Sequence, residues 1–213
     1  MNKTNIALVK HAEKWLGQAY WFGTYCQSCT EARLNAKKKQ YPGHYTSGRM
    51  AKYRRQIQQG KKCTDCVGLI KGYCWDGTEG NPKYASNGCP DISANGMYRA
   101  AKVKGGIKTL PETPGLLLWR DGHIGVYVGN GYAIEARGFA YGVVKTKVKD
   151  RTWTNWCECP YIEYVGGANQ PVESVLGDRV LKKGMKGADV KSLQEKLRDL
   201  GYELPKFGAD GEY

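Results

Sequence analysis

The hydrophobic pattern of the chain changes character near residue 114, and this change constrains the fold more than any other feature. Before it, apolar residues recur at helical spacing in three segments, 4–16, 66–75 and 94–104. After it, short apolar or alternating runs separated by turn residues predict strands over 115–119, 123–128, 132–136, 142–149 and 161–165. Helices that precede a small antiparallel sheet are typical of an α+β domain and not of a wound parallel sheet.

A strongly basic segment, residues 26–61, interrupts the helical part of this pattern. Pro42-Gly43 divides the segment, so we expect two helices, about 28–40 and 47–59, joined by a turn. The segment is either a solvated helical hairpin or a surface that attracts polyanions, and the sequence favours neither interpretation.

A second change of composition separates the C-terminal end of the chain. Residues 166–171 have the glycine, asparagine and proline content of a linker, and beyond them Asp189 can cap a helix that Gly201 closes. The last 36 residues are too few to bury much surface. We therefore expect a domain over 1–166 with the basic helical insertion at about 26–61, a linker over 167–177 and a truncated helical module over 178–213.

The charge of the chain lies almost entirely in its larger part. The formal net charge is +13 over 213 residues; residues 1–177 hold 25 Lys and Arg against 13 Asp and Glu, and the remainder holds eight against seven. A field of this sign attracts polyanions, such as nucleic acid or the anionic polymers of a bacterial wall. Because no zinc-finger, basic-zipper or RNA-recognition pattern accompanies the charge, nucleic acid is not the expected partner.

The N-terminal segment gives an expectation about location. Residues 1–10 have no apolar run followed by a small-residue cleavage site, so we expect no signal peptide. No apolar run in the chain approaches the length that spans a membrane. The protein is therefore expected to be synthesised in the cytoplasm and to depend on another route of release if it acts outside.

Eight cysteines are a high number for such a chain, and they stand at 26, 29, 63, 66, 74, 89, 157 and 159. Without a secretory signal, a framework of disulfides is not expected in the producing cell. The pairs Cys26/Cys29 and Cys63/Cys66 have the spacing of zinc half-sites, but no pair of histidines completes the pattern. We expect no metal or cofactor, and most of the other cysteines are interpreted as small buried apolar residues.

Cys66 and His123 are the candidate catalytic pair. Cys66 begins a predicted helix directly after Asp65, which can cap it, and a helix N-terminus favours a thiolate. His123 begins a predicted strand directly after a turn, where a side chain can point into a cleft. The other histidines, His11 and His44, lie in helical and basic contexts that suit a general base less well. A thiol and an imidazole in one cleft would form a cysteine nucleophile site.

Glu135 is the candidate third member of this site. It is a lone carboxylate in an apolar run, across a predicted hairpin from the strand of His123. Burying a carboxylate is costly unless the group is paired, and pairing with His123 would also fix the tautomer of the imidazole. The alternative is a surface glutamate that pairs with Arg137.

Four segments of the chain resemble one known family. Asp-Cys-Val-Gly-Leu-Ile at 65–70, Pro-Gly-Leu-Leu-Leu-Trp at 114–119 and His-Ile-Gly-Val-Tyr-Val-Gly-Asn-Gly at 123–131 are similar to the NlpC family of papain-like cell-wall endopeptidases. The tyrosine-containing segment 16–23 resembles the segment that precedes the nucleophile in that family. The resemblance covers residues 1 to about 165, with the insertion at 26–61 as an unusual addition.

The resemblance implies a papain-like core and a cysteine peptidase that acts on peptidoglycan stem peptides, usually between γ-D-glutamate and the diamino acid. It implies that Cys66 is the nucleophile, that His123 is the general base and acid, and that Glu135 occupies the orienting position. The backbone N–H of Cys66 would contribute to an oxyanion hole.

The resemblance also implies a substrate site at Tyr20, Asp65 and Val67. Two of its residues depart from the family pattern. Val67 stands where the family often has serine, which puts the usual substrate contacts there in doubt. Glu135 stands where the family often has His, Asn or Gln, and a carboxylate should stabilise the imidazolium more strongly than an amide.

The tail resembles the start of a three-helix peptidoglycan-binding repeat, from Leu181 to Tyr202 and on to Asp210-Gly211-Glu212. This order of parts is the layout of a phage or prophage endolysin: a catalytic domain, a glycine-rich linker and a wall-binding module, with no signal peptide. In that setting the basic domain would be drawn to anionic wall polymers.

Two other interpretations stay open at the level of sequence. The first is an amidase on the same scaffold, which would cut between muramic acid and L-alanine. The second, of a different class, is a zinc-bearing nucleic-acid module built on Cys26, Cys29, Cys63 and one more cysteine.

Overall fold

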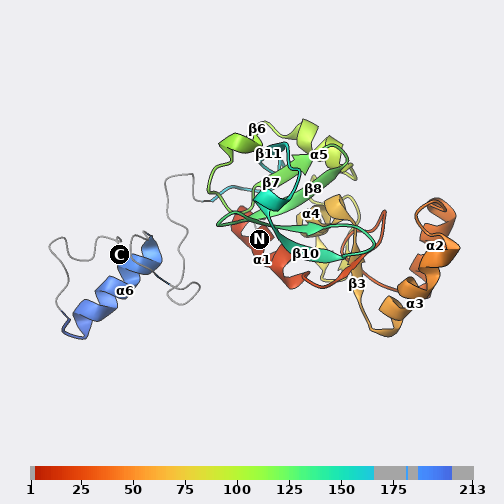
Figure 1. Ribbon diagram of the computed structural model, residues 1–213, viewed down its shortest axis with the longest axis horizontal. Helices are drawn as coiled ribbons and strands as arrows, with labels where there is room; N and C mark the ends of the chain where they lie inside the picture. Colours follow the sequence, from red (N-terminus) through yellow and green to blue (C-terminus); the bar gives the residue numbers. More distant parts are fainter. Residues whose placement is uncertain (1–2, 166–180, 182–186, 203–213) are drawn as a thin grey trace. The chain divides into compact units, whose positions relative to one another are not determined.

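The computed structural model describes residues 3–165, 181 and 187–202 (Figure 1). The chain divides into two units, Met1–Val165 and Gly166–Tyr213. In the second unit the described residues form one helix, α6 (Ala188–Asp199). The predicted linker over 167–177 lies outside the described residues. No helix in the described part of the chain has the length and apolar character needed to cross a membrane.

The first unit begins with helices, as the sequence pattern predicts. They are α1 (Asn5–Lys14), α2 (Glu31–Gln40), α3 (Met50–Gln58), α4 (Cys66–Cys74) and α5 (Ala94–Ala100), with single 3-10 turns at Ser47–Arg49, Ile107–Thr109 and Val148–Asp150. The starts of α1, α2, α4 and α5 follow from local chemistry, because Thr4, Thr30, Asp65 and Ser93 each accept a hydrogen bond from an otherwise unpaired N–H of the first helical turn.

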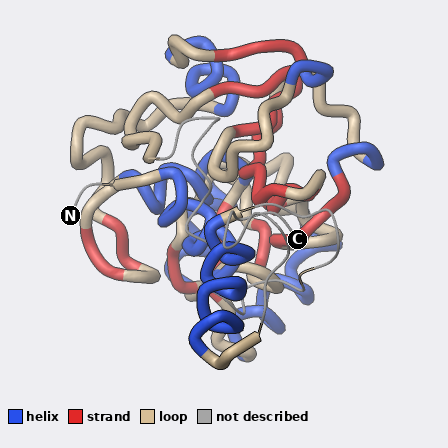
Figure 2. Tube along the Cα trace, turned by 90° about the vertical axis from the view of Figure 1, so that its left-hand side faces the viewer, coloured by secondary structure: helices blue, strands red, loops and turns tan. Residues whose placement is uncertain are grey.

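A six-stranded antiparallel sheet follows, in the order β10-β9-β8-β7-β11-β6. Its strands are β6 (Lys104–Gly106), β7 (Leu117–Arg120), β8 (His123–Gly129), β9 (Tyr132–Ala136), β10 (Val143–Lys147) and β11 (Asn155–Cys157). Two small sheets consist of β1 (Ala19–Tyr20), β3 (Lys62–Thr64) and β2 (Gln27–Ser28), and of β4 (Gly77–Thr78) and β5 (Asn81–Pro82). The predicted α+β class is confirmed (Figure 2).

Three sequence predictions about elements are wrong. The helix expected to continue to residue 104 ends at Ala100, and 104–106 form the edge strand β6. Residues 161–165 form no strand of the sheet, since β11 fills the place between β7 and β6. Helix α6 begins at Ala188 after Gly187, so Asp189 lies inside the helix and is not its N-cap.

The main core lies where α1 and α4 pack against β8 and β9 (Figure 1). Leu8 of α1, Ile70 of α4 and Val126 of β8 are all fully buried in it. The helix that carries the candidate nucleophile is therefore fixed directly on the strand that begins with His123.

The insertion shares a second apolar cluster with the segment that precedes it and with β3, so it is not merely a solvated hairpin. Trp21 and Tyr53 are buried in this second cluster, with ring centroids 5.1 Å apart, and Leu34 of α2 joins them. Lys52 of α3 donates to the backbone carbonyl of Phe139 at 2.9 Å, which ties the insertion to the loop between β9 and β10. Helices α2 and α3 lie side by side at one edge of the first unit (Figure 1).

Candidate active site

Asp65 positions the start of α4. One carboxylate oxygen accepts from the backbone N–H of Gly68 at 2.6 Å, which closes the first turn of the helix. The other accepts from the N–H of Gly23 at 2.9 Å, in the turn that follows β1. The predicted cap is confirmed, and Asp65 also ties the segment that carries Tyr20 to the helix that carries Cys66.

Cys66 differs from the other cysteines in its exposure. All eight are free thiols, seven of them are buried, and Cys66 alone is partly exposed. Burial raises the pKa of Cys66 to about 12, the charge of Asp65 adds to this effect, and backbone N–H groups including that of Ile124 oppose it. The sequence suggested that the helix N-terminus would favour a thiolate. In the structure, burial raises the pKa of Cys66 by more than the N–H groups at the helix N-terminus lower it. The protonated thiol is therefore the favoured form, and attack by the sulfur needs a base to take its proton.

His123 and Glu135 form the pair that the sequence predicts. Nε2 of His123 lies 2.7 Å from a carboxylate oxygen of Glu135, and both side chains are buried. Because Glu135 accepts, Nε2 carries the proton, and Nδ1 presents the lone pair of a general base. The ring of His123 also stacks on that of Trp153, with centroids 5.3 Å apart. The alternative partner, Arg137, instead lies over the ring of Tyr141.

Two further residues hold Glu135, and sequence reasoning missed both. Thr146 donates to Glu135 at 2.8 Å, and Arg151 donates to both carboxylate oxygens at 2.6 and 2.9 Å. Burial alone would raise the pKa of Glu135, but hydrogen bonds from His123, Arg151 and Thr146 outweigh it and lower the pKa to about 2. Glu135 is therefore an ionised carboxylate throughout the neutral range.

The two halves of the candidate site approach each other where α4 meets β8. A backbone hydrogen bond from Ile124, the residue after His123, reaches the sulfur of Cys66. Among the described residues Nδ1 of His123 has no hydrogen-bond partner, whereas Nε2 is occupied by Glu135. This arrangement places the thiol beside the first residues of the strand that carries the imidazole.

A cleft of about 480 Å³ opens beside Cys66. Tyr20, Asp65 and Val67, the residues expected at the substrate site, all line it. Val67 is also a core residue and is only 6% exposed, so only a small part of its side chain is accessible from the cleft. Whether these residues contact a substrate stays a prediction.

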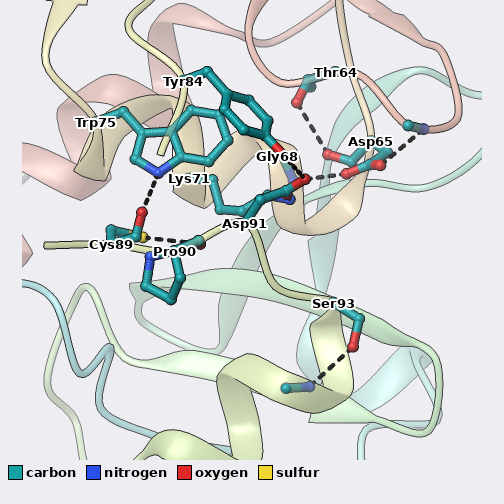
Figure 3. A network of polar contacts seen from close by, with 12 residues as sticks. Thr64, Asp65, Gly68, Lys71, Trp75, Tyr84, Cys89, Pro90, Asp91 and Ser93 are labelled. Atoms are coloured by element: carbon teal, nitrogen blue, oxygen red, sulfur yellow. Dashed lines mark hydrogen bonds and ion pairs between the residues drawn. The ribbon is translucent and has the colours of Figure 1, made fainter. Parts of the chain in front are cut away.

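A polar network (Figure 3) also contributes to the lining of this cleft. Lys71 of α4 forms an ion pair with Asp91, and the hydroxyl of Tyr84 donates to the same carboxylate at 2.7 Å. Lys71 and Asp91 thereby neutralise each other. Sequence reasoning missed this network because its members come from a helix and from a loop without a regular pattern.

The two cysteine pairs that have the spacing of zinc half-sites do not converge on one site among the described residues. Cys26 lies 3.4 Å from Nε2 of His11, and Cys29 lies next to Cys63. Among residues 3–165, 181 and 187–202, no group of three or more His, Cys, Asp or Glu side chains could hold a metal ion. The buried state of the cysteines other than Cys66 confirms their interpretation as core residues.

Comparison with solved structures finds similar folds in two proteins described as peptidoglycan hydrolases and in a P60 domain. RipB, a peptidoglycan hydrolase of Mycobacterium tuberculosis, is 18% identical with a TM-score of 0.44, over 75% of this chain and 65% of that chain. The NlpC/p60 domain of the peptidoglycan hydrolase SagA is 15% identical with a TM-score of 0.42, over 72% of this chain and 97% of that domain. The P60 domain of an antigen from M. avium subspecies paratuberculosis is 15% identical with a TM-score of 0.41, over 75% and 98%.

Comparison with curated proteins finds only short matches, and no family model matches the chain. A probable N-acetylmuramoyl-L-alanine amidase of Bacillus licheniformis is 59% identical over 49 residues, which are 23% of this chain and 14% of the relative. The amidase CwlL of the same organism is 56% identical over 34 residues, 16% of this chain and 9% of the relative. The matched part is thus a small fraction of either relative.

Proposed function

We propose that this protein is a peptidoglycan hydrolase, a cysteine endopeptidase that cleaves stem peptides at the bond between γ-D-glutamate and the diamino acid. One observation carries the proposal: a partly exposed thiol at the start of α4 adjoins β8, the strand that begins with His123, and the buried side chain of His123 pairs with Glu135 of β9. The motif resemblance at residues 65–70 and 123–131 supports the choice of substrate.

The proposed reaction uses His123 twice. As the sulfur of Cys66 attacks the carbonyl carbon, Nδ1 of His123 takes the thiol proton, which the raised pKa of Cys66 makes necessary. His123 then gives this proton to the leaving amine nitrogen, and a thioester to Cys66 remains. Water, deprotonated by His123, attacks the thioester and releases the carboxylic acid product and the free thiol.

The proposed reaction creates two charges that the protein can stabilise, a positive one on the imidazole of His123 and a negative one on the oxygen of the tetrahedral intermediate. Glu135 remains ionised and compensates the imidazolium that forms on His123. The N–H groups of Cys66 and Val67 occupy the first turn of α4, where no intrahelical acceptor exists, so they can donate to the oxygen of the tetrahedral intermediate.

The setting that we propose is that of an endolysin, synthesised in the cytoplasm and acting on the wall after release. The excess of positive charge in residues 1–177 fits a polyanionic wall, and residues 178–213 would supply further wall binding. No nucleic acid or cofactor takes part in this proposal.

A second candidate is the amidase reaction, between muramic acid and L-alanine. The observation that favours it is the name of the two curated relatives, although the segments matched are only 14% and 9% of those proteins. The same nucleophile and base would serve either bond.

Digestion of purified sacculi followed by mass spectrometry of the released fragments tests the proposal. We expect new amino termini on the diamino acid, and complete loss of release in the Cys66→Ala and His123→Ala variants with unchanged circular dichroism. New amino termini on L-alanine would favour the amidase instead. Release that persists in Cys66→Ala would contradict both.

A further inference from the structure

The insertion forms one wall of the candidate active-site cleft. Lys37, Gln40 and Tyr41, at the C-terminal end of α2, line the same cavity as Cys66. The insertion therefore contributes side chains to the place where a substrate of the proposed hydrolase would lie.

Lys37 is the cation of this wall. Three lysines follow one another at the end of α2, and of these Lys38 and Lys39 are exposed, whereas Lys37 is half-buried. Nζ of Lys37 donates to Gln40 at 2.9 Å and lies 5.4 Å from the ring centroid of Tyr41. A lysine in the last turn also interacts favourably with the helix dipole, but that explanation applies to all three residues equally. Of the three, only Lys37 lines the cavity.

The charges around Lys37 leave it without an ionic partner. Within the described residues it forms no ion pair, in contrast to Lys71, which is neutralised by Asp91. Asp65 is already satisfied by two backbone N–H groups. Burial lowers the pKa of Lys37, and the carboxylates of Asp65 and Asp91 oppose this effect. A half-buried ammonium whose hydrogen-bond partner is neutral can bind an anion without first giving up an ion pair.

The proposed substrate supplies such an anion by its own chemistry. A γ-linked glutamate uses its side-chain carboxyl group in the scissile bond, so its α-carboxylate stays free close to that bond. The end of a stem peptide carries a second carboxylate. We propose that Lys37 binds a carboxylate of the stem peptide and thereby sets substrate specificity; this inference rests on the proposed function and adds the insertion to its substrate site.

The test compares three synthetic stem peptides: one with both carboxylates free, one with the glutamate α-carboxylate converted to the amide, and one with the C-terminal carboxylate converted to the amide. For Lys37→Gln we expect kcat/KM to fall about 10- to 100-fold on the free acid, the range of a charged hydrogen bond. The loss should vanish on one of the two amides, which identifies the carboxylate bound. Lys38→Gln, the matched control on the exposed face, should stay within about twofold of wild type on all three.

Lys37→Arg, which keeps the charge, should retain most of the preference for the free acid. An equal loss on all three peptides, or no loss on any, would overturn the inference. These outcomes differ from a failure of the proposed function, in which wild type cleaves none of the peptides or Cys66→Ala cleaves them as well. Binding of the peptides to Cys66→Ala, with and without Lys37→Gln, gives a readout that is independent of turnover.

Discussion

At the scale of single residues, the candidate site depends on a carboxylate that has no exposed surface. Glu135 is 0% exposed and is held by donors from three side chains, His123, Thr146 and Arg151. A buried charge is tolerated only where paired groups replace its hydration. The position of the imidazole therefore depends on a network that extends beyond the three residues predicted from the sequence.

This network predicts how stability depends on pH. The pKa of Glu135 falls from an ordinary 4.5 to about 2 in the folded protein, and about 1.4 kcal/mol per pKa unit makes this worth about 3 kcal/mol. Because the folded pKa is the lower one, the contribution is complete above about pH 4.5 and is lost as the pH falls towards 2. Glu135→Gln should thus be about 3 kcal/mol less stable than wild type at pH 7, a difference that shrinks below pH 4.5.

Urea unfolding at several pH values between 7 and 2.5 measures this difference. Glu13→Gln, a change of an exposed glutamate on α1, is the control and should alter stability by less than about 0.5 kcal/mol at any pH. A Glu135→Gln deficit that stays constant over the whole range would show that the charge of Glu135 does not contribute.

The pair of His123 and Glu135 could be predicted because a lone carboxylate in an apolar strand needs a partner across the hairpin. Arg151 and Trp153 could not be predicted, since they follow a 3-10 turn and no periodicity places them. The raised pKa of Cys66 was missed for a different reason. Local sequence indicates the helix N-terminus but not the depth of burial, and burial has the larger effect.

At the scale of elements, the site depends on helix α4. Asp65 fixes the start of this helix and also holds the turn that follows β1. The same side chain caps α4 and accepts from the turn after β1. Its charge also raises the pKa of Cys66.

Asp65→Ala should therefore have two effects. The loss of the cap costs about 1 kcal/mol, and the unpaired N–H of Gly23 adds a further 1–2 kcal/mol, so the variant should be about 2–3 kcal/mol less stable. Removing the negative charge should lower the pKa of Cys66 and speed its alkylation by iodoacetamide at pH 8. Thermal and urea unfolding measure the first effect, and mass spectrometry of the alkylated protein the second.

Thr30→Ala on α2 is the matched control, because Thr30 caps its helix through a single hydrogen bond, which its hydroxyl oxygen accepts from the backbone N–H of Arg33 at 3.2 Å. It should cost about 1 kcal/mol and leave the alkylation of Cys66 unchanged. Equal destabilisation by the two substitutions would show that the contact with Gly23 contributes nothing.

Elements with strong local signals were predicted well, and those defined by pairing were not. The cap at Asp65 and the hairpin of β8 and β9 follow from turn chemistry and hydrophobic pattern. Strands β6 and β11 are only three residues long, and they exist because each pairs with a partner distant in sequence. The parallel pairing of β1 with β3 likewise joins segments on either side of the insertion.

At the scale of the whole molecule, the candidate site and the excess positive charge are distributed unequally between the two units. The larger unit contains the candidate site and nearly all of the excess positive charge, whereas residues 178–213 carry eight basic against seven acidic groups. Electrostatic attraction to a wall should thus reside in the larger unit. Any contribution of the tail should come from contacts that depend little on salt.

Deleting residues 168–213 separates these contributions. The hydrogen bond from Val165 to Asn5 lies before the cut, so the thermal unfolding of the larger unit should be unchanged. We expect kcat/KM on soluble stem peptides to stay within about twofold, because none of the cleft-lining residues is removed. Binding to purified walls should become weaker and more sensitive to salt, since mainly charge attraction remains. Co-sedimentation with walls between low and high salt measures this; equal salt sensitivity with and without the tail would mean that the tail does not bind the wall.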